Sequence, residues 1–598
     1  LALKRLRANG RYLAPDTNDE WRAFAFALRN WFVLHLILGL YLVAIAAALE
    51  MLACWLDQNP QFWRLLTHPA VFDLPRRLYF DFGLWPTLLA GLSLLTLLVA
   101  LSAWLATNLR CYSAVQSAYI GLLGGVVYLA IFTGPNLLAR GFHLAVDSQT
   151  FAVIGIGTGL LGLATAFALW QLVTKGTQVL ANERSTQGRL ILPVIAVVVG
   201  LAWMSLIQLV AIRFCSGGFV LPWLGSKWAL ISAALLLLYF VAIWFVNYTS
   251  LALFYRSRLE RAYLGASNKE RKGPLHDNHE TDRIPMENYR PYEAGGPLHF
   301  INVTLNETVD ARSSVTQPRA SGMNLAISAT TISVAARHHA QLLRSDKSHR
   351  YAAAPEKAVP GERDEDLFHV FKGIRPDAAP SLGTLAMWTA VSGAAVSTGM
   401  GSYTLLTRSF LLGFLNFRLG WWWNSGISAT SREGTQFRHR PVGVTIRNLF
   451  PGVSTLLNEF MGYFHGTARR YWYLTDGGHF ENTGAYELVR RRLPLIFVCD
   501  HGHDPRGIFE DFANLVRRCR LDFGAEVTLL ERRHLDRLFP RSLAVKFMTQ
   551  QEIAEFSDTE AKQRPEARFY AAVATYRNEP DQASLLIFLK PALTKAES

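Results

Sequence analysis

The chain has 598 residues, of which 51% are hydrophobic and 18% are charged, and its net charge is +14. A water-soluble protein of this length would have several domains, but long apolar runs that need a bilayer rather than a globular core dominate roughly the first 260 residues. The excess of basic residues is typical of cytoplasmic loops beside anionic lipid. Because no basic-aromatic binding motif is present, we expect no nucleic-acid partner.

Six apolar stretches are each long enough to cross ~30 Å of hydrocarbon as a helix. They cover residues 31–56, 84–106, 118–138, 150–174, 190–212 and 228–255. Both flanks of this region are rich in lysine and arginine, whereas the loop between the third and fourth stretches carries only Arg140. Basic flanks stay in the cytoplasm. We therefore predict an integral membrane protein with an all-α bundle of about six transmembrane helices over 31–256 and with both ends in the cytoplasm.

The glycine pattern at 157–162 (GTGLLG) matches the dinucleotide fingerprint GxGxxG. That fingerprint needs a strand before it and a helix after it, but this run lies inside the fourth apolar stretch. Gly155 and Gly159 also form a GxxxG pattern, which favours close packing of two helices. Since the interiors of the stretches carry almost no ionisable groups, a transporter is the weaker interpretation.

The second half reads as an α/β domain, because short apolar runs alternate with amphipathic helical patterns. Residues 1–30 are interpreted as a cytoplasmic flank, 257–290 as a polar linker and 291–598 as the α/β domain, with a mobile surface insertion at 336–366. The expected strands cover 298–305, 384–392, 471–475, 495–499, 569–575 and 585–589, and the expected helices cover 483–492 and 508–521.

The feature that suggests chemistry is the turn Asp476-Gly477-Gly478, which follows the expected strand 471–475. A carboxylate at the end of a strand is held on a rigid frame, and two glycines let the chain turn sharply. On spacing alone, a simple Asx turn explains the aspartate equally well. The two interpretations remain open at this point.

A longer pattern decides between them. Residues 471–505 read YWYLTDGGHFENTGAYELVRRRLPLIFVCDHGHDP, and two further segments read GGPLHFINVTLNET (295–308) and AVSGAAVSTGMG (390–401). Together they resemble the bacterial membrane-bound branch of the patatin-like phospholipase family. The resemblance implies a patatin-like fold in the α/β portion, a bacterial inner-membrane location and hydrolysis of carboxylic esters of lipids by a Ser–Asp dyad. Asp476 matches the catalytic aspartate of the family and Gly477 and Gly478 form its supporting turn. A membrane lipid is then the substrate, and neither a cofactor nor a metal is implied.

The serine of the dyad is not apparent, because no Gly-x-Ser-x-Gly occurs in the chain, although the family carries its nucleophile in that elbow. The chain begins with Leu1 rather than methionine. We therefore expect a C-terminal portion of a longer protein, in which the serine half precedes the apolar stretches. The alternative is a non-catalytic membrane scaffold that keeps the fold. A third hypothesis uses Ser397, because Ala395–Gly399 (AVSTG) is one residue away from the elbow pattern; Ser392 is a weaker candidate.

Other residues favour structural roles. His479 follows the two glycines, but a Ser–Asp dyad needs no histidine, so a hydrogen-bonding role is expected. His501 and His503 have a spacing that suits a metal, yet no third ligand motif accompanies them. The run Trp421-Trp422-Trp423 is typical of buried packing or of contact with a membrane interface. The five cysteines are scattered and predict neither a disulfide framework nor a metal site. The sequence does not indicate an oligomeric state.

Overall fold

The computed structural model describes part of the chain, and every structural statement below concerns that part. It comprises residues 20–35, 37, 244–271, 279–308, 321–335, 338–344, 351–355, 383–425, 451–502, 504, 508–554, 569–577 and 579–590. The chain divides into two compact units, one joining Leu1–Asn30 to Ile243–Ser598 and the other consisting of Trp31–Ala242. Nearly all described residues belong to the first unit.

The predicted membrane bundle is contradicted. Within the described ranges, no helix is long and apolar enough to cross a bilayer, and the predicted integral-membrane location is wrong on the same finding. Four of the six predicted spans, and the GxGxxG run, lie outside the described residues. Where the sixth span is described, α10 (Trp244–Tyr248) ends before α11 (Ala252–Leu259) begins. Ala252 belongs to a core of the protein itself, and hydropathy does not distinguish such a core helix from a span.

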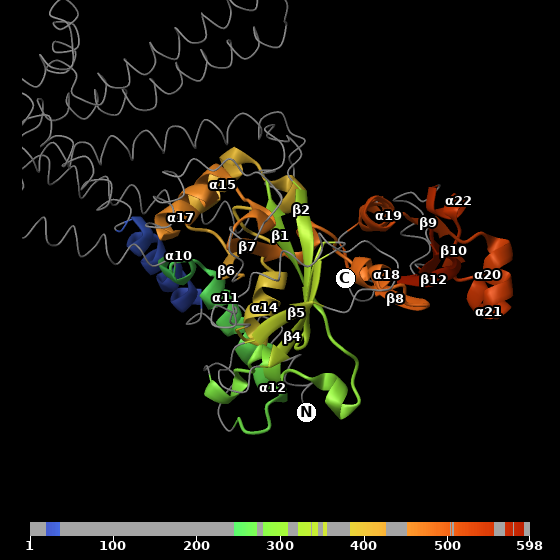
Figure 1. Ribbon diagram of the computed structural model, residues 1–598, viewed down its shortest axis with the longest axis horizontal. Helices are drawn as coiled ribbons and strands as arrows, with labels where there is room; N and C mark the ends of the chain where they lie inside the picture. The colour runs from blue at the N-terminus through green and yellow to red at the C-terminus, as the bar shows by residue number, and fades with distance from the viewer. Residues whose placement is uncertain are drawn as a thin grey trace, which may run out of the picture. The chain divides into compact units, whose positions relative to one another are not determined.

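The first sheet has seven strands in the order β5-β4-β3-β2-β1-β7-β6, and every neighbouring pair is antiparallel (Figure 1). Val303 and Leu474, on two of its interior strands, are fully buried. The strands are β1 (Ile301–Glu307), β2 (Ser321–Ile327), β3 (Thr331–Val334), β4 (His338–Arg344), β5 (Tyr351–Pro355), β6 (Trp421–Asn424) and β7 (Tyr471–Asp476). The three tryptophans of β6 are buried, which agrees with a packing role for that run.

Helices pack on this sheet, and one of them corrects a prediction. Residues 384–392 were expected to form a strand, but α14 (Leu385–Ser392) is a helix that packs against β1 and β7. Thr384 caps it, because its hydroxyl accepts a hydrogen bond from the amide of Met387 at 3.2 Å. The run is apolar on nearly every face of the helix, so its sequence has no periodicity that separates a buried helix from a buried strand.

The other helical elements around this sheet are short. α15 (Leu406–Phe414) and α17 (Pro451–Met461) pack side by side (Figure 1). The remaining elements are the π-helix η1 (Glu260–Leu264), α12 (Gly265–Ser267), and the 3-10 turns η2 (Glu280–Asp282), η3 (Met286–Asn288), η4 (Pro291–Ala294), η6 (Gly401–Tyr403), η8 (Gly466–Ala468) and η9 (Gly477–His479).

The second sheet is mixed. Its order is β10-β11-β12-β8, with β9 paired to β11; β12 and β8 run parallel, whereas β11 and β12 are antiparallel. The strands are β8 (Leu495–Cys499), β9 (Ala525–Leu529), β10 (Phe547–Met548), β11 (Phe569–Tyr576) and β12 (Glu579–Leu589), and the helices are α18 (Ala485–Arg490), α19 (Glu510–Phe523), α20 (Arg532–Leu538), α21 (Arg541–Ala544) and α22 (Gln550–Ala554). The described fold thus combines helices with two sheets, rather than an all-α bundle followed by an α/β portion.

The intervals expected as a linker and as a mobile insertion both contain ordered structure. The interval 257–290 was expected to be a linker, but in it Arg271 and Asp282 form a buried ion pair at 3.1 Å with side chains 2% and 1% exposed. This ion pair joins two parts of the interval, so the interval is folded around it. The interval 336–366 was expected to be a mobile insertion, but strands β4 and β5 occupy 338–344 and 351–355. The two strands pair in antiparallel register, with Arg344 opposite Tyr351.

Candidate active site

Asp476 is the last residue of β7, a strand with neighbours on both sides. It lies opposite Val303 of β1, and the preceding Trp472, Tyr473, Leu474 and Thr475 are all buried. A residue at the end of such a strand has little freedom to move, because the sheet and its core fix the backbone on both sides.

The two glycines that follow Asp476 have no room for a side chain. A Cβ added to Gly477 would lie 2.7 Å from the backbone oxygen of Asn302 on β1, and one added to Gly478 would lie 2.7 Å from Oδ1 of Asn482. The amide of Gly478 donates to Oδ1 of Asp476 at 2.7 Å. The turn therefore has the hydrogen bond of an Asx turn and also brings the aspartate close to β1.

The carboxyl group of Asp476 keeps one oxygen available. In the part of the chain that the structure describes, Oδ1 accepts the Gly478 amide and no hydrogen bond to Oδ2 is found. Burial raises the pKa of Asp476 to about 6, and the hydrogen bond from the Gly478 amide opposes that shift. A carboxylate with such a pKa is ionised at neutral pH and is a stronger base than an exposed aspartate.

His479 uses both ring nitrogens within the fold. Nε2 lies 3.2 Å from the carbonyl oxygen of Ala395 and Nδ1 lies 3.0 Å from the hydroxyl of Thr475. Because a carbonyl only accepts, Nε2 carries the proton, and Nδ1 accepts from the Thr475 hydroxyl. Burial lowers the pKa of His479 to about 4. The ring is therefore neutral and holds the turn to the 394–401 segment rather than pointing to a nucleophile.

A second contact joins the 394–401 segment to the same strand. Oδ1 of Asn306 accepts the amide of Gly401 at 2.9 Å, and Nδ2 of Asn306 donates to the Thr475 hydroxyl at 2.8 Å. A Cβ on Gly401 would lie 2.5 Å from the backbone oxygen of His479. The segment that the sequence offered as an alternative elbow thus lies against the Asp476 turn.

Ser397 does not have the geometry of a nucleophile. It is fully buried, and its hydroxyl donates to the carbonyl of Ala394 at 2.9 Å. The segment follows the helix α14 and not a strand, so the strand–turn–helix context of an elbow is absent here. The hydroxyl of Ser392, at the end of α14, donates to the carbonyl of Asn302 on β1 at 2.8 Å. The same carbonyl lies against Gly477.

Two polar residues follow the turn, and His501 and His503 are the remaining candidates from the sequence. Glu481 accepts the amides of Thr483 and Tyr486 at the start of α18. Nδ2 of Asn482 donates to Asp511 of α19 at 3.1 Å. His501 is exposed, His503 lies outside the described residues, and no group of three metal-ligating side chains is found among the residues described.

Sequence reasoning missed the residues that support the turn. Asn306 and Thr475 are polar and fully buried, and such groups in an apolar strand are a signal that a partner exists. The sequence does not say which partner, because Asn306 and Thr475 meet across the β1–β7 pair from positions 169 residues apart.

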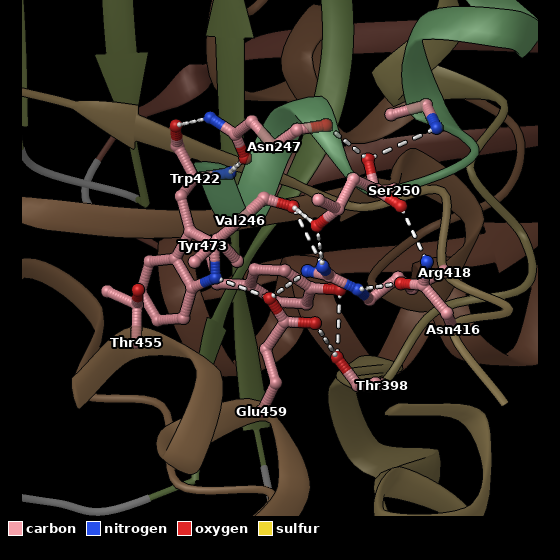
Figure 2. Close-up of polar contacts among 12 residues, drawn as sticks. Val246, Asn247, Ser250, Thr398, Asn416, Arg418, Trp422, Thr455, Glu459 and Tyr473 are labelled. Carbon is pink, nitrogen blue, oxygen red and sulfur yellow. Dashed lines mark hydrogen bonds and ion pairs between the residues drawn. The ribbon is translucent and has the colours of Figure 1, made fainter. Parts of the chain in front are cut away.

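A buried polar cluster contacts Thr398 of the 394–401 segment (Figure 2). Arg418 and Glu459 form an ion pair at 2.7 Å, with side chains 1% and 0% exposed. Thr398 donates to Glu459 at 3.1 Å and contacts the hydroxyl of Tyr473 at 2.8 Å. The segment therefore contacts both this cluster and the Asp476 turn.

Comparison of the chain with protein families, with characterised proteins and with solved structures gave no match. The functional argument therefore depends on the site itself.

Proposed function

We propose that this chain supplies the general base of a serine acyl hydrolase that cleaves carboxylic esters of lipids, with Asp476 in that role. The observation that carries the proposal is a partly buried carboxyl group at the end of an interior strand, with a pKa of about 6 and one oxygen available. The segment 471–505, with its resemblance to patatin-like phospholipases, supports the same role.

The chemistry would proceed in two steps. The hydroxyl of a serine attacks the ester carbonyl while Oδ2 of Asp476 takes its proton, and the protonated carboxyl then gives that proton to the departing alcohol. In the second step Asp476 takes a proton from water as the water attacks the acyl-enzyme. The acyl–serine ester bond then breaks, the carboxylic acid leaves, and the proton returns from Asp476 to the serine oxygen. His479 takes no part, because both of its ring nitrogens are engaged.

The pattern Gly-x-Ser-x-Gly does not occur in this sequence. The nucleophilic serine would therefore come from a Gly-x-Ser-x-Gly segment outside it. Ser397 is unsuited to the role by its burial and by its bond to Ala394.

An apolar substrate is supported by the surface near the turn. Tyr403, Leu405 and Leu406 are 51%, 52% and 58% exposed, and they follow directly on Gly401, which lies against the backbone of His479. Exposed large apolar side chains that gather beside a candidate site are typical of surfaces that receive apolar ligands.

The test is ester hydrolysis by the product of the complete natural reading frame that contains this chain, assayed with a p-nitrophenyl ester and with phospholipid. Asp476→Asn should lower kcat/KM by roughly 10²–10⁴-fold, the usual contribution of a general base. Asp511→Asn is the matched control, because Asp511 also has a pKa raised by burial but contacts the site only through Asn482. Full activity in Asp476→Asn would overturn the proposal.

A second candidate is a non-catalytic scaffold that keeps this fold, and the missing Gly-x-Ser-x-Gly favours it. It predicts no ester hydrolysis from the complete reading frame, and no covalent labelling by a fluorophosphonate that reacts with activated serines.

A further inference from the structure

In the buried cluster of Figure 2, each side-chain nitrogen of Arg418 and each carboxylate oxygen of Glu459 has a hydrogen-bond partner. Oε1 of Glu459 accepts from Nη1 of Arg418 and from the indole Nε1 of Trp422, each at 2.7 Å. The remaining donors of Arg418 reach Asn416 at 2.9 Å and the carbonyl of Val246 at 2.8 Å. A buried ion pair adds little stability compared with apolar packing, so its value lies in fixing one arrangement of the groups around it.

Thr398 joins this cluster to the strand that carries the candidate base. Its hydroxyl lies 3.1 Å from Oε2 of Glu459 and 2.8 Å from the hydroxyl of Tyr473. Tyr473 belongs to β7, three residues before Asp476. The carbonyl of Thr398 also accepts the hydroxyl of Ser409 at 2.5 Å. Thr398 is 1% exposed, and these contacts leave it no alternative position.

The segment that Thr398 anchors then holds the Asp476 turn. Ala395, three residues before Thr398, accepts Nε2–H of His479 at 3.2 Å, and Gly401, three residues after it, donates to Asn306 at 2.9 Å. His479 closes the turn that begins at Asp476. A chain of direct contacts therefore runs from Glu459 through Thr398 and the 394–401 backbone to the turn.

We propose that Thr398, held by the Arg418–Glu459 pair, is a positioning residue for Asp476: it fixes the 394–401 segment over the Asp-Gly-Gly turn and keeps water away from the carboxyl group. This role rests on the proposed function of Asp476. Loss of the Thr398 hydroxyl leaves Oε2 of Glu459 without that donor and releases the segment from β7. Water then reaches the turn, and the pKa of Asp476 falls from about 6 towards its ordinary value of 3.8.

The experiment is a titration of the Asp476 carboxyl by ¹³C NMR in the full chain labelled at aspartate, with Asp476→Asn to assign the signal. Among the described residues, the charged or titratable groups near the turn are His479 within it, which is neutral above about pH 4, Glu481, whose amide donates to the carbonyl of Gly477, Arg408 from α15, which acts on His479, and Asp511 from α19, which is reached through Asn482. None of them is changed by the variants.

Thr398→Val keeps the shape and removes the hydroxyl, and it should lower the pKa of Asp476 by about one unit or more, a tenfold change in the protonation equilibrium. Thr398→Ser keeps the hydroxyl and should restore the wild-type value. Thr398→Ala repeats the test if valine prevents folding.

Thr455→Val is the matched control. Thr455 is also buried and lies on α17 with Glu459, but among the described residues its hydroxyl bonds only the carbonyls of Pro451 and Gly452, each at 2.9 Å. It should leave the Asp476 pKa unchanged. A folded Thr398→Val protein with the wild-type pKa, or an equal shift in Thr455→Val, would overturn the proposal. The titration needs neither serine nor substrate, so this failure is distinct from an absence of ester hydrolysis, which would overturn the proposed function.

Discussion

An aspartate whose pKa is raised by burial destabilises the folded state once it ionises. The pKa of Asp476 is about 6 in the fold against an ordinary value of 3.8, with burial as the largest cause. The folded state therefore binds the proton more tightly than the unfolded chain, so the stability contributed by this group is greatest below pH 3.8 and is lost as the pH rises to about 6. Residues retained at such a cost are frequent at functional sites.

We predict that Asp476→Asn stabilises the protein at pH 8 by about 1–3 kcal/mol, as follows from a shift of about two pKa units. At pH 4 the difference should be close to zero, because the wild-type carboxyl is then protonated in the fold. Urea unfolding followed by tryptophan fluorescence at the two pH values measures this. An equal difference at both pH values would show that the ionisation of Asp476 carries no such penalty.

The position of Asp476 at the end of a strand could be predicted from the sequence, because Asp476, Gly477 and Gly478 are adjacent and follow a run typical of a strand. The support of the turn could not. Asn306, Thr398 and His479 support the turn by hydrogen bonds to residues of other segments. Those segments lie far apart in the chain, and no local sequence pattern indicates which of them come into contact. The surroundings of Ser397 were equally hidden, since its bond to Ala394 depends on a turn that follows a helix rather than the expected strand.

At the scale of elements, the sequence predicted well where a pattern was local and strong. The strand 495–499 has its predicted limits, and β7, β11 and β12 include the predicted strands. The strand predicted at 384–392 was wrong, because an apolar run of eight or nine residues suits a buried helix and a buried strand equally. Only the cap at Thr384 marks the helix, and a threonine before an apolar run is a weak signal.

We predict that Thr384→Ala lowers the free energy of unfolding by about 1 kcal/mol through loss of the α14 cap. Thr389→Ala serves as the comparison. Thr389 is an exposed residue of the same helix, and within the described part of the chain its hydroxyl bonds only the carbonyl of Leu385. The variant should change stability by less than about 0.5 kcal/mol. Thermal unfolding of both variants decides the matter. If the two effects are equal, the Thr384 side chain does not cap a helix.

At the scale of the molecule, apolar composition led to a predicted membrane span and polar composition led to a predicted linker, and both segments contain buried residues of the fold. Apolar residues near 244–255 predicted a span, but Ala252 lies in a core of the protein. Polar residues at 257–290 predicted a linker, but Arg271 and Asp282 are buried there as an ion pair. Both errors arise because composition indicates how apolar a segment is. It does not indicate whether lipid, water or another part of the protein contacts that segment.

The Arg271–Asp282 pair allows a test of that correction. Arg271→Met leaves the carboxylate of Asp282 buried without its partner and should destabilise the protein by about 3–5 kcal/mol. The double variant with Asp282→Leu should regain much of that loss. Arg520→Met is the control, because the Arg520–Glu526 pair is exposed at 59% and 52% and should contribute less than about 1 kcal/mol. Equal effects in urea unfolding would mean that the 257–290 segment contributes as little as a surface loop.

The central claim is that Asp476 acts as a general base, and the pH dependence of ester hydrolysis tests it most directly. Because the carboxylate form is the base, kcat/KM for the product of the complete reading frame should rise with pH through an apparent pKa near 6 and then level off. Asp476→Asn should remove both the activity and this rise, whereas Asp511→Asn should keep them. A profile that lacks a rise near pH 6, or that persists in Asp476→Asn, would contradict the assignment.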